Sequence, residues 1–460
     1  MPANPFQYLR PVPPQDFVGR WGLVNEIAEN LLVEGGDSHA VIAGRRCGKS
    51  SLMLALAYQL RQTETLEAGD WTPLIVPFDF KSSKLASEGG CLAELFESVR
   101  RHVDVSVRRR PTDAWPTPVA LEAGWFLELQ KAGTLSLQDF EDGLAYILDQ
   151  IRVPDKPVRL VLLIDEMDEP LGFPWTDALF NQLRALIYSS DLKEQVRLVL
   201  TGSRRFLDEV SNRGSPLWNV LMFHYLQAMD EASIRQLAER ARKVYPEGLA
   251  EEVVAEVWRQ CGGQPFLAQC LLYELFQEEG RLPGSAATIQ SLAEGFIFER
   301  IADLEGWARA MEAAGLLAYR VLVGSGDWMD ETEIGRAVGD ATVNVKRGLT
   351  ALCFHGTAIH DGSWRRYRQV GDLFKAWFAT QGAAFLPQAE KPATVQVVPG
   401  EIHARTVIIS ASTQVEVGDE VMGDKVEGDK VGGDKITTGD IEGGGDVAIG
   451  GEAADSGADT

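Results

Sequence analysis

The sequence predicts an α/β domain in which helices flank a parallel β-sheet, followed by further helical segments and a tail. Three stretches carry this prediction, residues 40–50, 159–166 and 196–205, and each is an apolar run that ends in polar residues. Apolar runs without alternation are typical of strands buried on both faces, as in a parallel sheet. Ligands of such sheets bind at the carboxyl ends of the strands, so we expect the polar residues to meet there.

The first stretch contains a phosphate-binding loop. A strand-like segment (40–42) precedes the loop and an apolar helix pattern follows it, which is the setting that such a loop requires. Backbone N–H groups and the positive end of the helix would surround an anion. Lys49 would reach the β- and γ-phosphates, and the Ser50 hydroxyl would ligate Mg²⁺. The loop and the residue after it read Ala43-Gly44-Arg45-Arg46-Cys47-Gly48-Lys49-Ser50-Ser51. We expect all of these residues except Ala43 to contact the nucleotide.

The second stretch supplies an acidic pair. The apolar run from Leu160 to Ile164 ends in Asp165 and Glu166. Asp165 would hold Mg²⁺ through water, and Glu166 would orient and activate the attacking water. Asp168 and Glu169 continue the acidic run; we interpret them as a solvated turn, with a role in the nucleotide cycle as the alternative.

The third stretch ends in hydroxyl and guanidinium groups. The apolar run 196–200 leads to Thr201, Ser203, Arg204 and Arg205. Thr201 or Ser203 would sense the γ-phosphate by a hydrogen bond, and Arg204 or Arg205 would neutralise its charge, which strongly affects phosphoryl transfer. The alternative is that both arginines only begin the next helix.

Two further motifs complete a pattern known from one class of proteins. Phe17-Val18-Gly19-Arg20 lies before the phosphate loop, and Gly263-Gln264-Pro265 lies well after it. With these motifs, residues 14–380 resemble the STAND signal-transduction ATPases, and most closely their archaeal-type ATPases, relatives of the origin-recognition AAA+ ATPases. The resemblance implies nucleotide contacts near the adenine and ribose from Val18, Gly19 and Arg20, and one from a helical lid by Pro265.

The order of these patterns divides the chain into segments. Gly262-Gly263 is expected to end one lid helix and Pro265 to begin the next. Residues 110–155 are expected to be an insertion in the ATPase domain. The predicted segments are an N-terminal extension (1–16), a P-loop ATPase domain (17–228), a helical lid (229–300), a winged-helix domain (301–380), a linker (381–400), a Gly-Asp repeat segment (401–451) and a disordered tail (452–460).

Residues 301–380 are expected to form the winged helix. Two short helix patterns, 331–338 and 343–349, precede two strand-like runs that Asp361-Gly362 separates, and this dipeptide is a hairpin signal. An intramolecular clamp on the ATPase domain is favoured over DNA binding, because the net charge of -23 opposes a general nucleic-acid binder. If the domain did bind DNA, the phosphates would be gripped by Arg365, Arg366 and Arg368.

The composition is that of a globular protein from a reducing compartment. The hydrophobic fraction of 45% suffices for packed cores in a chain of 460 residues. No window approaches the roughly 18 apolar residues that a membrane span needs, and the first residues lack the features of a secretory signal. The five cysteines show no Cys-x-x-Cys spacing, so neither a zinc site nor a disulfide framework is expected. Oxidation of Cys47 would disturb phosphate contacts, so we expect a cytoplasmic location.

The tail contains a repeat of period five. Its apolar positions are separated by Gly-Asp pairs and are Val421, Val426, Val431, Ile436 and Ile441. An odd period would place successive apolar residues on opposite faces of a flat strand, so the chain must turn at the Gly-Asp pairs to gather them. A small β-solenoid is one interpretation and disorder is the other. An ordered repeat would serve oligomerisation or partner recruitment.

Together these features predict a nucleotide-operated switch. ATP or ADP with Mg²⁺ would bind between the α/β domain and the lid, with Ser50 and Asp165 as metal ligands and slow hydrolysis by Glu166, Lys49 and Arg204. The ATP-bound state would favour self-association or recruitment of a separate effector protein, and the resemblance implies signalling or defence. The alternatives are a DNA-associated ATPase and a scaffold with a vestigial ATPase; the intact loop and acidic pair count against the scaffold.

Overall fold

The computed structural model describes residues 4–62, 67–82, 87–109, 135–151, 156–279 and 284–386, together with four short strand segments of the tail. The chain divides into two compact units, Met1–Leu386 and Pro387–Thr460, and each is described by itself.

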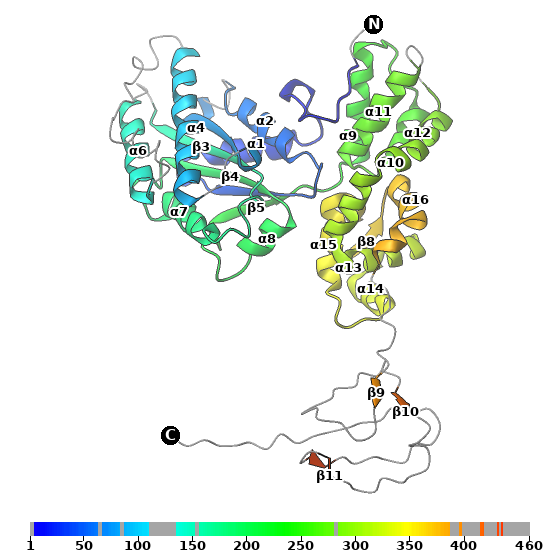
Figure 1. Ribbon diagram of the computed structural model, residues 1–460. Coiled ribbons are helices and arrows are strands. Elements are labelled where there is room, and N and C mark those ends of the chain that lie inside the picture. Colours follow the sequence, from blue (N-terminus) through cyan, green and yellow to red (C-terminus); the bar gives the residue numbers. More distant parts are fainter. Residues whose placement is uncertain are drawn as a thin grey trace. The chain divides into compact units, whose positions relative to one another are not determined.

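A five-stranded parallel sheet forms the centre of the N-terminal half (Figure 1), and its strand order is β2-β3-β4-β1-β5. Every residue of β1 and β4 is buried, which confirms the parallel sheet predicted from the apolar runs. The register pairs Ile42 with Gly202 and Ile164 with Leu200, so the polar residues after β1, β3 and β4 lie at one edge. The strands are β1 (Ser38–Ile42), β2 (Thr72–Asp79), β3 (Val158–Asp165), β4 (Val196–Gly202) and β5 (Leu221–Tyr225).

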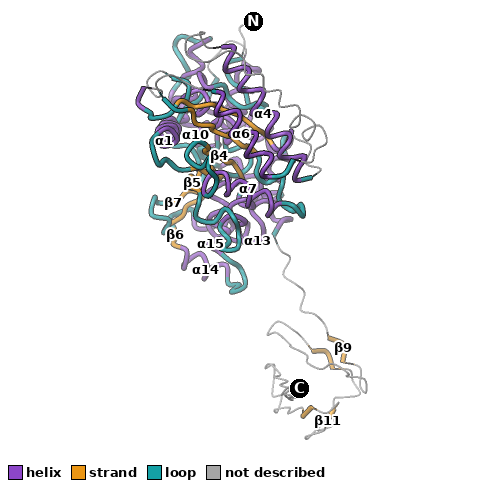
Figure 2. Tube along the Cα trace, turned by 90° about the vertical axis from the view of Figure 1, so that its left-hand side faces the viewer, coloured by secondary structure: helices purple, strands orange, loops and turns teal. Residues whose placement is uncertain are grey.

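Helices cover both faces of the sheet. Side chains alternate along β3, so Val161 and Leu163 join one hydrophobic core while Leu160 and Leu162 join the other. The first core is completed by α1 (Trp21–Leu32) and α2 (Lys49–Gln59). The second is completed by α4 (Glu88–Arg109), α6 (Leu137–Gln150), α7 (Thr176–Tyr188) and α8 (Arg204–Val210), of which α4 and α6 lie side by side (Figure 2).

A group of helices, here called the lid helices, follows the sheet. As predicted, one helix ends at Gly262, whose φ is 59°, and the next begins at Pro265. Gly263 has a φ of 86°, and a Cβ there would collide with the Met229 carbonyl oxygen, so glycine is required. The N-terminal segment packs on this group through Phe6, which is buried in the same core. The lid helices are α9 (Glu231–Ala238), α10 (Glu251–Cys261), α11 (Pro265–Glu279) and α12 (Ala286–Glu299).

Residues 301–380, here called the 301–380 segment, combine helices with a small antiparallel sheet of order β6-β8-β7. The predicted hairpin is present, since β7 and β8 pair across Asp361-Gly362. The helix expected over 343–349 begins at Val345, because Asn344 caps it, and runs on to Gly356, whose φ is 70°. The elements are α13 (Ile301–Ser325), β6 (Met329–Asp330), α14 (Glu331–Val338), α15 (Val345–His355), β7 (Ala358–His360), β8 (Arg366–Gln369) and α16 (Asp372–Thr380).

Helix α13 is interrupted at Glu312. This residue has φ 57° and ψ 178°, a backbone conformation that is almost confined to glycine. The carboxylate of Glu312 accepts a hydrogen bond from Arg347 at 3.1 Å. The interruption therefore combines local backbone strain with a long-range ion pair.

The strain at Glu312 predicts an order of stability for two substitutions. Glu312→Gly and Glu312→Ala both remove the carboxylate, but only glycine adopts this conformation without steric cost. We expect the glycine variant to be more stable than the alanine variant by about 1 kcal/mol, which corresponds to roughly 2 °C in the thermal midpoint. Differential scanning calorimetry of both variants checks this, and an alanine variant as stable as the glycine variant would contradict it.

The second unit is described only at four short strands. β9 (Val395–Val397) pairs in parallel with β10 (Val415–Val417), and β11 (Lys430–Val431) pairs antiparallel with β12 (Asp434–Lys435). The Gly-Asp repeat predicted over 401–451 lies largely outside the described residues, as do residues 110–134 and 152–155 of the predicted 110–155 insertion. Within the described part of the chain, no helix combines the length and apolar character that crossing a bilayer requires.

Candidate functional site

A cavity of about 750 Å³ opens where β1, β3 and β4 end. Its other walls include the N-terminal segment, the lid helices α9 and α11, α13 and α15. The predicted residues that border it are Val18, Arg20, Gly44, Arg45, Arg46, Gly48, Lys49, Ser50, Ser51, Glu166, Ser203, Arg204 and Pro265. The remaining predicted residues, Gly19, Cys47, Asp165 and Thr201, are described but do not belong to this lining.

The phosphate loop, residues 43–50, wraps around the start of α2. Gly48 caps this helix with φ 90°, and the Lys49 ammonium donates to the carbonyl oxygens of Ala43 and Gly44, both at 3.2 Å. Arg45 and Arg46 are exposed. Arg46 pairs with Asp303 of α13 at 2.9 Å, so the loop is tied to the 301–380 segment.

Two hydroxyl groups flank the Asp165 carboxylate. Ser50 Oγ donates to Asp165 Oδ2 at 2.6 Å, and the fully buried Thr201 donates to Oδ1. Hydroxyl and carboxylate oxygens are the protein ligands that Mg²⁺ prefers beside phosphate oxygens. Ser50 and Asp165 therefore fit a magnesium ion, with Thr201 orienting the carboxylate from the neighbouring strand.

Glu166 follows Asp165 in a strained conformation. Its φ is 60°, and its N–H donates to Asp165 Oδ1 at 2.9 Å. Burial raises the pKa of the Glu166 carboxyl, Lys49 opposes that shift, and Asp165 adds to it. A carboxylate with a raised pKa at the rim of the cavity has the properties of a general base.

The polar residues after β4 both begin a helix and border the cavity. Ser203 caps α8, which starts at Arg204. Asp168 lies in the turn that we expected but is not simply solvated, because its carboxylate accepts from Ser203 N–H and Oγ, both at 2.6 Å, and from Phe206 N–H at 3.2 Å. Asp168 thereby offsets the unsatisfied N–H groups of the first turn of α8. Nothing in the local sequence connects residues 168 and 203, so sequence reasoning missed this contact.

Arg20 joins three parts of the site. Its guanidinium donates to the carbonyl oxygens of Cys47 and Gln227, both at 2.6 Å, and burial lowers its pKa. Val18 and Pro265 both border the cavity, whereas Gly19 faces Ser233 of α9. Arg20 therefore fixes the phosphate loop to the segment that leads into the lid.

Sequence reasoning missed several groups of cavity residues, among them the N-terminal segment and Lys81. The N-terminal segment 7–12 borders the cavity, and the Val12 N–H donates to Ser51 Oγ at 3.0 Å. Lys81, just after β2, also borders it. The sequence did contain a signal for Lys81, because this residue follows an apolar run like the three used above, and that run forms β2 of the same parallel sheet.

The end of α15 lies against the phosphate loop. The Gly44 N–H donates to the Phe354 carbonyl oxygen at 2.9 Å, and Cys47 Sγ donates to the same oxygen at 3.0 Å. His355 is buried beside them; burial and, to a lesser degree, Lys49 lower its pKa to about 3. Sequence reasoning also missed these contacts, which join residues about 300 positions apart.

The hairpin arginines lie away from this lining. Arg366 donates to the Trp328 carbonyl oxygen at 3.1 Å, and the Arg368 guanidinium lies over the Trp328 ring at 5.1 Å from its centroid. Arg365 is exposed. Two of the three arginines predicted for DNA contacts thus take part in local packing.

One of the solved structures that match this chain shows the same fold. A Walker-type ATPase of Pyrococcus abyssi matches with a TM-score of 0.50 and 16% identity, over 81% of this chain and 99% of that chain. The ORC2 protein of Aeropyrum pernix in its ADP form matches with a TM-score of 0.44 and 16% identity, over 83% and 98%. The ORC1 protein of Aeropyrum pernix in complex with DNA has a TM-score of 0.39 and 14% identity, over 82% and 96%.

Sequence comparison identifies the family. No curated protein sequence matches the chain. A family profile described as Novel STAND NTPase 1 matches residues 5–294, which is more than half of the chain and includes the phosphate loop, the acidic pair and the lid helices. The resemblance to STAND ATPases seen in the motifs is thereby confirmed, and the chain belongs to the Novel STAND NTPase 1 family.

Proposed function

We propose that the chain is a slowly hydrolysing ATP switch in which the 301–380 segment acts as a clamp on the phosphate loop. The observation that supports this most directly is the 2.9 Å hydrogen bond from the Gly44 N–H to the Phe354 carbonyl oxygen. A phosphate loop binds anions through its N–H groups, so a phosphate oxygen and the Phe354 carbonyl compete for one donor. Nucleotide binding and clamping are therefore coupled.

The proposed catalytic roles follow from the geometry of the cavity. Lys49 would exchange its two carbonyl partners for phosphate oxygens, and Ser50 and Asp165 would hold Mg²⁺. Bound Mg²⁺ would supply electrostatic stabilisation of the phosphate oxygens. Glu166 would accept a proton from the attacking water, and Arg204 would neutralise charge on the γ-phosphate.

Because of the clamp, ATP and ADP shift the equilibrium between the clamped and the released state to different extents. A ligand shifts a conformational equilibrium only if it binds the two states with different affinity. Burial and Lys49 lower the pKa of His355 to about 3, so it is neutral and adds no positive charge beside Lys49. We infer that the clamped state tolerates ADP and that ATP favours its release, leaving the protein able to self-associate or recruit an effector. Family membership supports a role in signalling or defence.

The test is the oligomeric state of the full chain. Light scattering after size exclusion is measured without nucleotide, with ADP, and with ATP plus Mg²⁺ on the Glu166→Gln variant. We expect a defined oligomer only with ATP. An unchanged mass under conditions where ATP binding is confirmed would contradict ATP-driven self-association and direct attention to DNA or a separate partner chain.

A further inference from the structure

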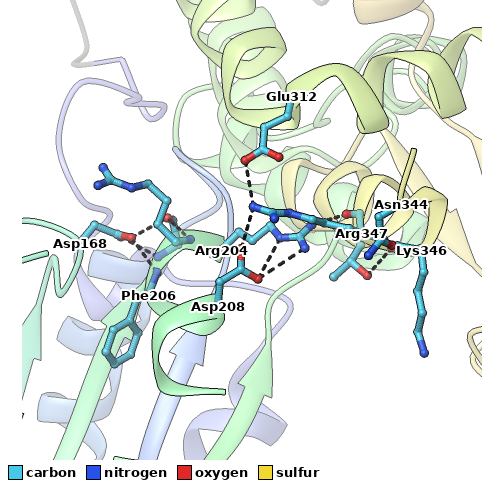
Figure 3. Close-up of polar contacts among 11 residues, drawn as sticks. Asp168, Arg204, Phe206, Asp208, Glu312, Asn344, Lys346 and Arg347 are labelled. Carbon is cyan, nitrogen blue, oxygen red and sulfur yellow. Dashed lines mark hydrogen bonds and ion pairs between the residues drawn. The ribbon is translucent and has the colours of Figure 1, made fainter. Parts of the chain in front are cut away.

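The guanidinium of Arg204 is engaged by the 301–380 segment. Arg204 borders the cavity and is the residue proposed to meet the γ-phosphate. Its side chain nevertheless donates to the main-chain carbonyl of Arg347 in α15 and lies 3.4 Å from Asp208 Oδ1 (Figure 3). If Arg204 binds the γ-phosphate as proposed, that phosphate competes with both partners for its guanidinium.

Asp208 is shared between two arginines of different segments. Its Oδ1 faces Arg204 at 3.4 Å, and its Oδ2 pairs with Arg347 at 3.0 Å (Figure 3). Arg347 also pairs with Glu312 at 3.1 Å, at the interruption of α13. Two guanidinium groups and two carboxylates therefore balance in charge and join α8 to the 301–380 segment.

The position of Arg347 is unfavourable for its own helix. Arg347 lies in the first turn of α15, where the N-terminal end of the helix dipole repels a cation. Its ion pairs with Asp208 and Glu312 compensate for this repulsion. A cation thus stands where the helix dipole disfavours it, and long-range ion pairs hold it there. Such departures from local preference are common at functional positions.

We propose that Asp208 is a positioning residue that, with the main-chain carbonyl of Arg347, holds Arg204 away from the γ-phosphate site. This inference rests on the proposed function, in which Arg204 binds the γ-phosphate. ATP competes with Asp208 for Arg204, whereas ADP lacks the competing group. The network therefore sets how strongly the protein distinguishes ATP from ADP, and it couples that distinction to release of the 301–380 segment.

The test is the ratio of ATP to ADP affinity, measured with Mg²⁺ by calorimetry on full-length Glu166→Gln protein. Asp208→Asn weakens the restraint on Arg204, so we expect the ratio to rise about threefold, the scale of an exposed ion pair. The rise should shrink at about 1 M salt, because half-exposed ion pairs are screened. Arg204→Ala should lower the ratio, and adding Asp208→Asn to it should change nothing further.

Two variants separate positioning from other effects. Glu209→Gln removes the same charge from the same helix without a contact to Arg204, and we expect an unchanged ratio. Glu312→Gln breaks the other ion pair of Arg347, so it loosens the contact between segments but leaves Asp208 beside Arg204. A change in the ratio that comes only from this loosening should persist in the Arg204→Ala background, whereas the rise caused by Asp208→Asn should not. A merely structural role for Asp208 would give a change that persists there.

The outcomes distinguish the inference from the function on which it rests. If Arg204→Ala lowers the ratio but Asp208→Asn does not raise it, the positioning role is wrong and the γ-phosphate role stands. If Arg204→Ala leaves the ratio unchanged, or the protein binds no ATP, the proposed function itself is wrong at this residue. A rise with Asp208→Asn that persists in the Arg204→Ala background would also overturn the positioning role.

Discussion

Glu166→Gln is expected to lower the rate constant of ATP hydrolysis by about 10²–10⁴-fold while ATP still binds. Glutamine keeps the size of the side chain but accepts no proton, so only the chemical step is affected. Single-turnover phosphate release measures the rate, and calorimetry measures binding. Because burial raises the pKa of Glu166, the wild-type rate should fall as pH decreases through a value above that of an ordinary glutamate.

The matched control is Glu29→Gln, which removes an exposed carboxylate from α1 outside the cavity lining. It should leave both the rate and its pH dependence unchanged. A Glu166→Gln protein that hydrolyses ATP at the wild-type rate would show that another group activates the water. Lys81 and Ser203 would then be the next cavity residues to substitute, because both border the same space.

Gly44→Ala is expected to release the 301–380 segment from the phosphate loop. A Cβ at Gly44 would lie 2.6 Å from the Phe354 carbonyl oxygen, which is main chain, and 2.7 Å from Nδ1 of the buried His355. Such overpacking costs about 1–3 kcal/mol, which shifts the clamped-to-released equilibrium by roughly 5- to 150-fold. Nucleotide exchange should accelerate accordingly, as measured with a fluorescent ADP analogue.

Cys47 provides a second readout of the same substitution, without nucleotide. Its thiol is buried and donates to the Phe354 carbonyl oxygen, so release should speed its alkylation, followed by peptide mass spectrometry. Gly22→Ala is the control, since a Cβ there meets nothing within 4 Å. His355→Ala removes the imidazole ring and adds no bulk, so it should release the clamp less than Gly44→Ala does. Slow Cys47 alkylation in a folded Gly44→Ala protein would contradict the clamp.

Much of the sheet domain was predictable because its signals are local. The apolar runs before Ala43, Asp165 and Thr201 form β1, β3 and β4; Asp165 ends β3 as expected, and Glu166 follows it. The turn at Gly262-Gly263 and the helix start at Pro265 also match, since both depend on backbone preferences of the residues themselves.

The composition of the site was only partly predictable. The motif residues Lys49, Ser50 and Glu166 border one cavity, because parallel strands bring their carboxyl ends to a single edge. The contacts of Asp168 and Phe354 were not predictable, because each joins segments whose separation in sequence says nothing about their distance in space. Asp168 in particular lies in the turn that its local sequence predicts, but its carboxylate also caps the start of α8, which the sequence does not show.

The sequence by itself determined the strands, the phosphate loop, the acidic pair and the ends of several helices, because hydrophobic periodicity and backbone preferences act between near neighbours. Only the tertiary structure decided that the Gly44 N–H donates to the Phe354 carbonyl oxygen, and that Arg204 contacts Asp208 and the Arg347 carbonyl oxygen of α15. The physical reason is that these contacts depend on how whole segments pack, and a polar group alone in the sequence does not reveal which distant partner will satisfy it.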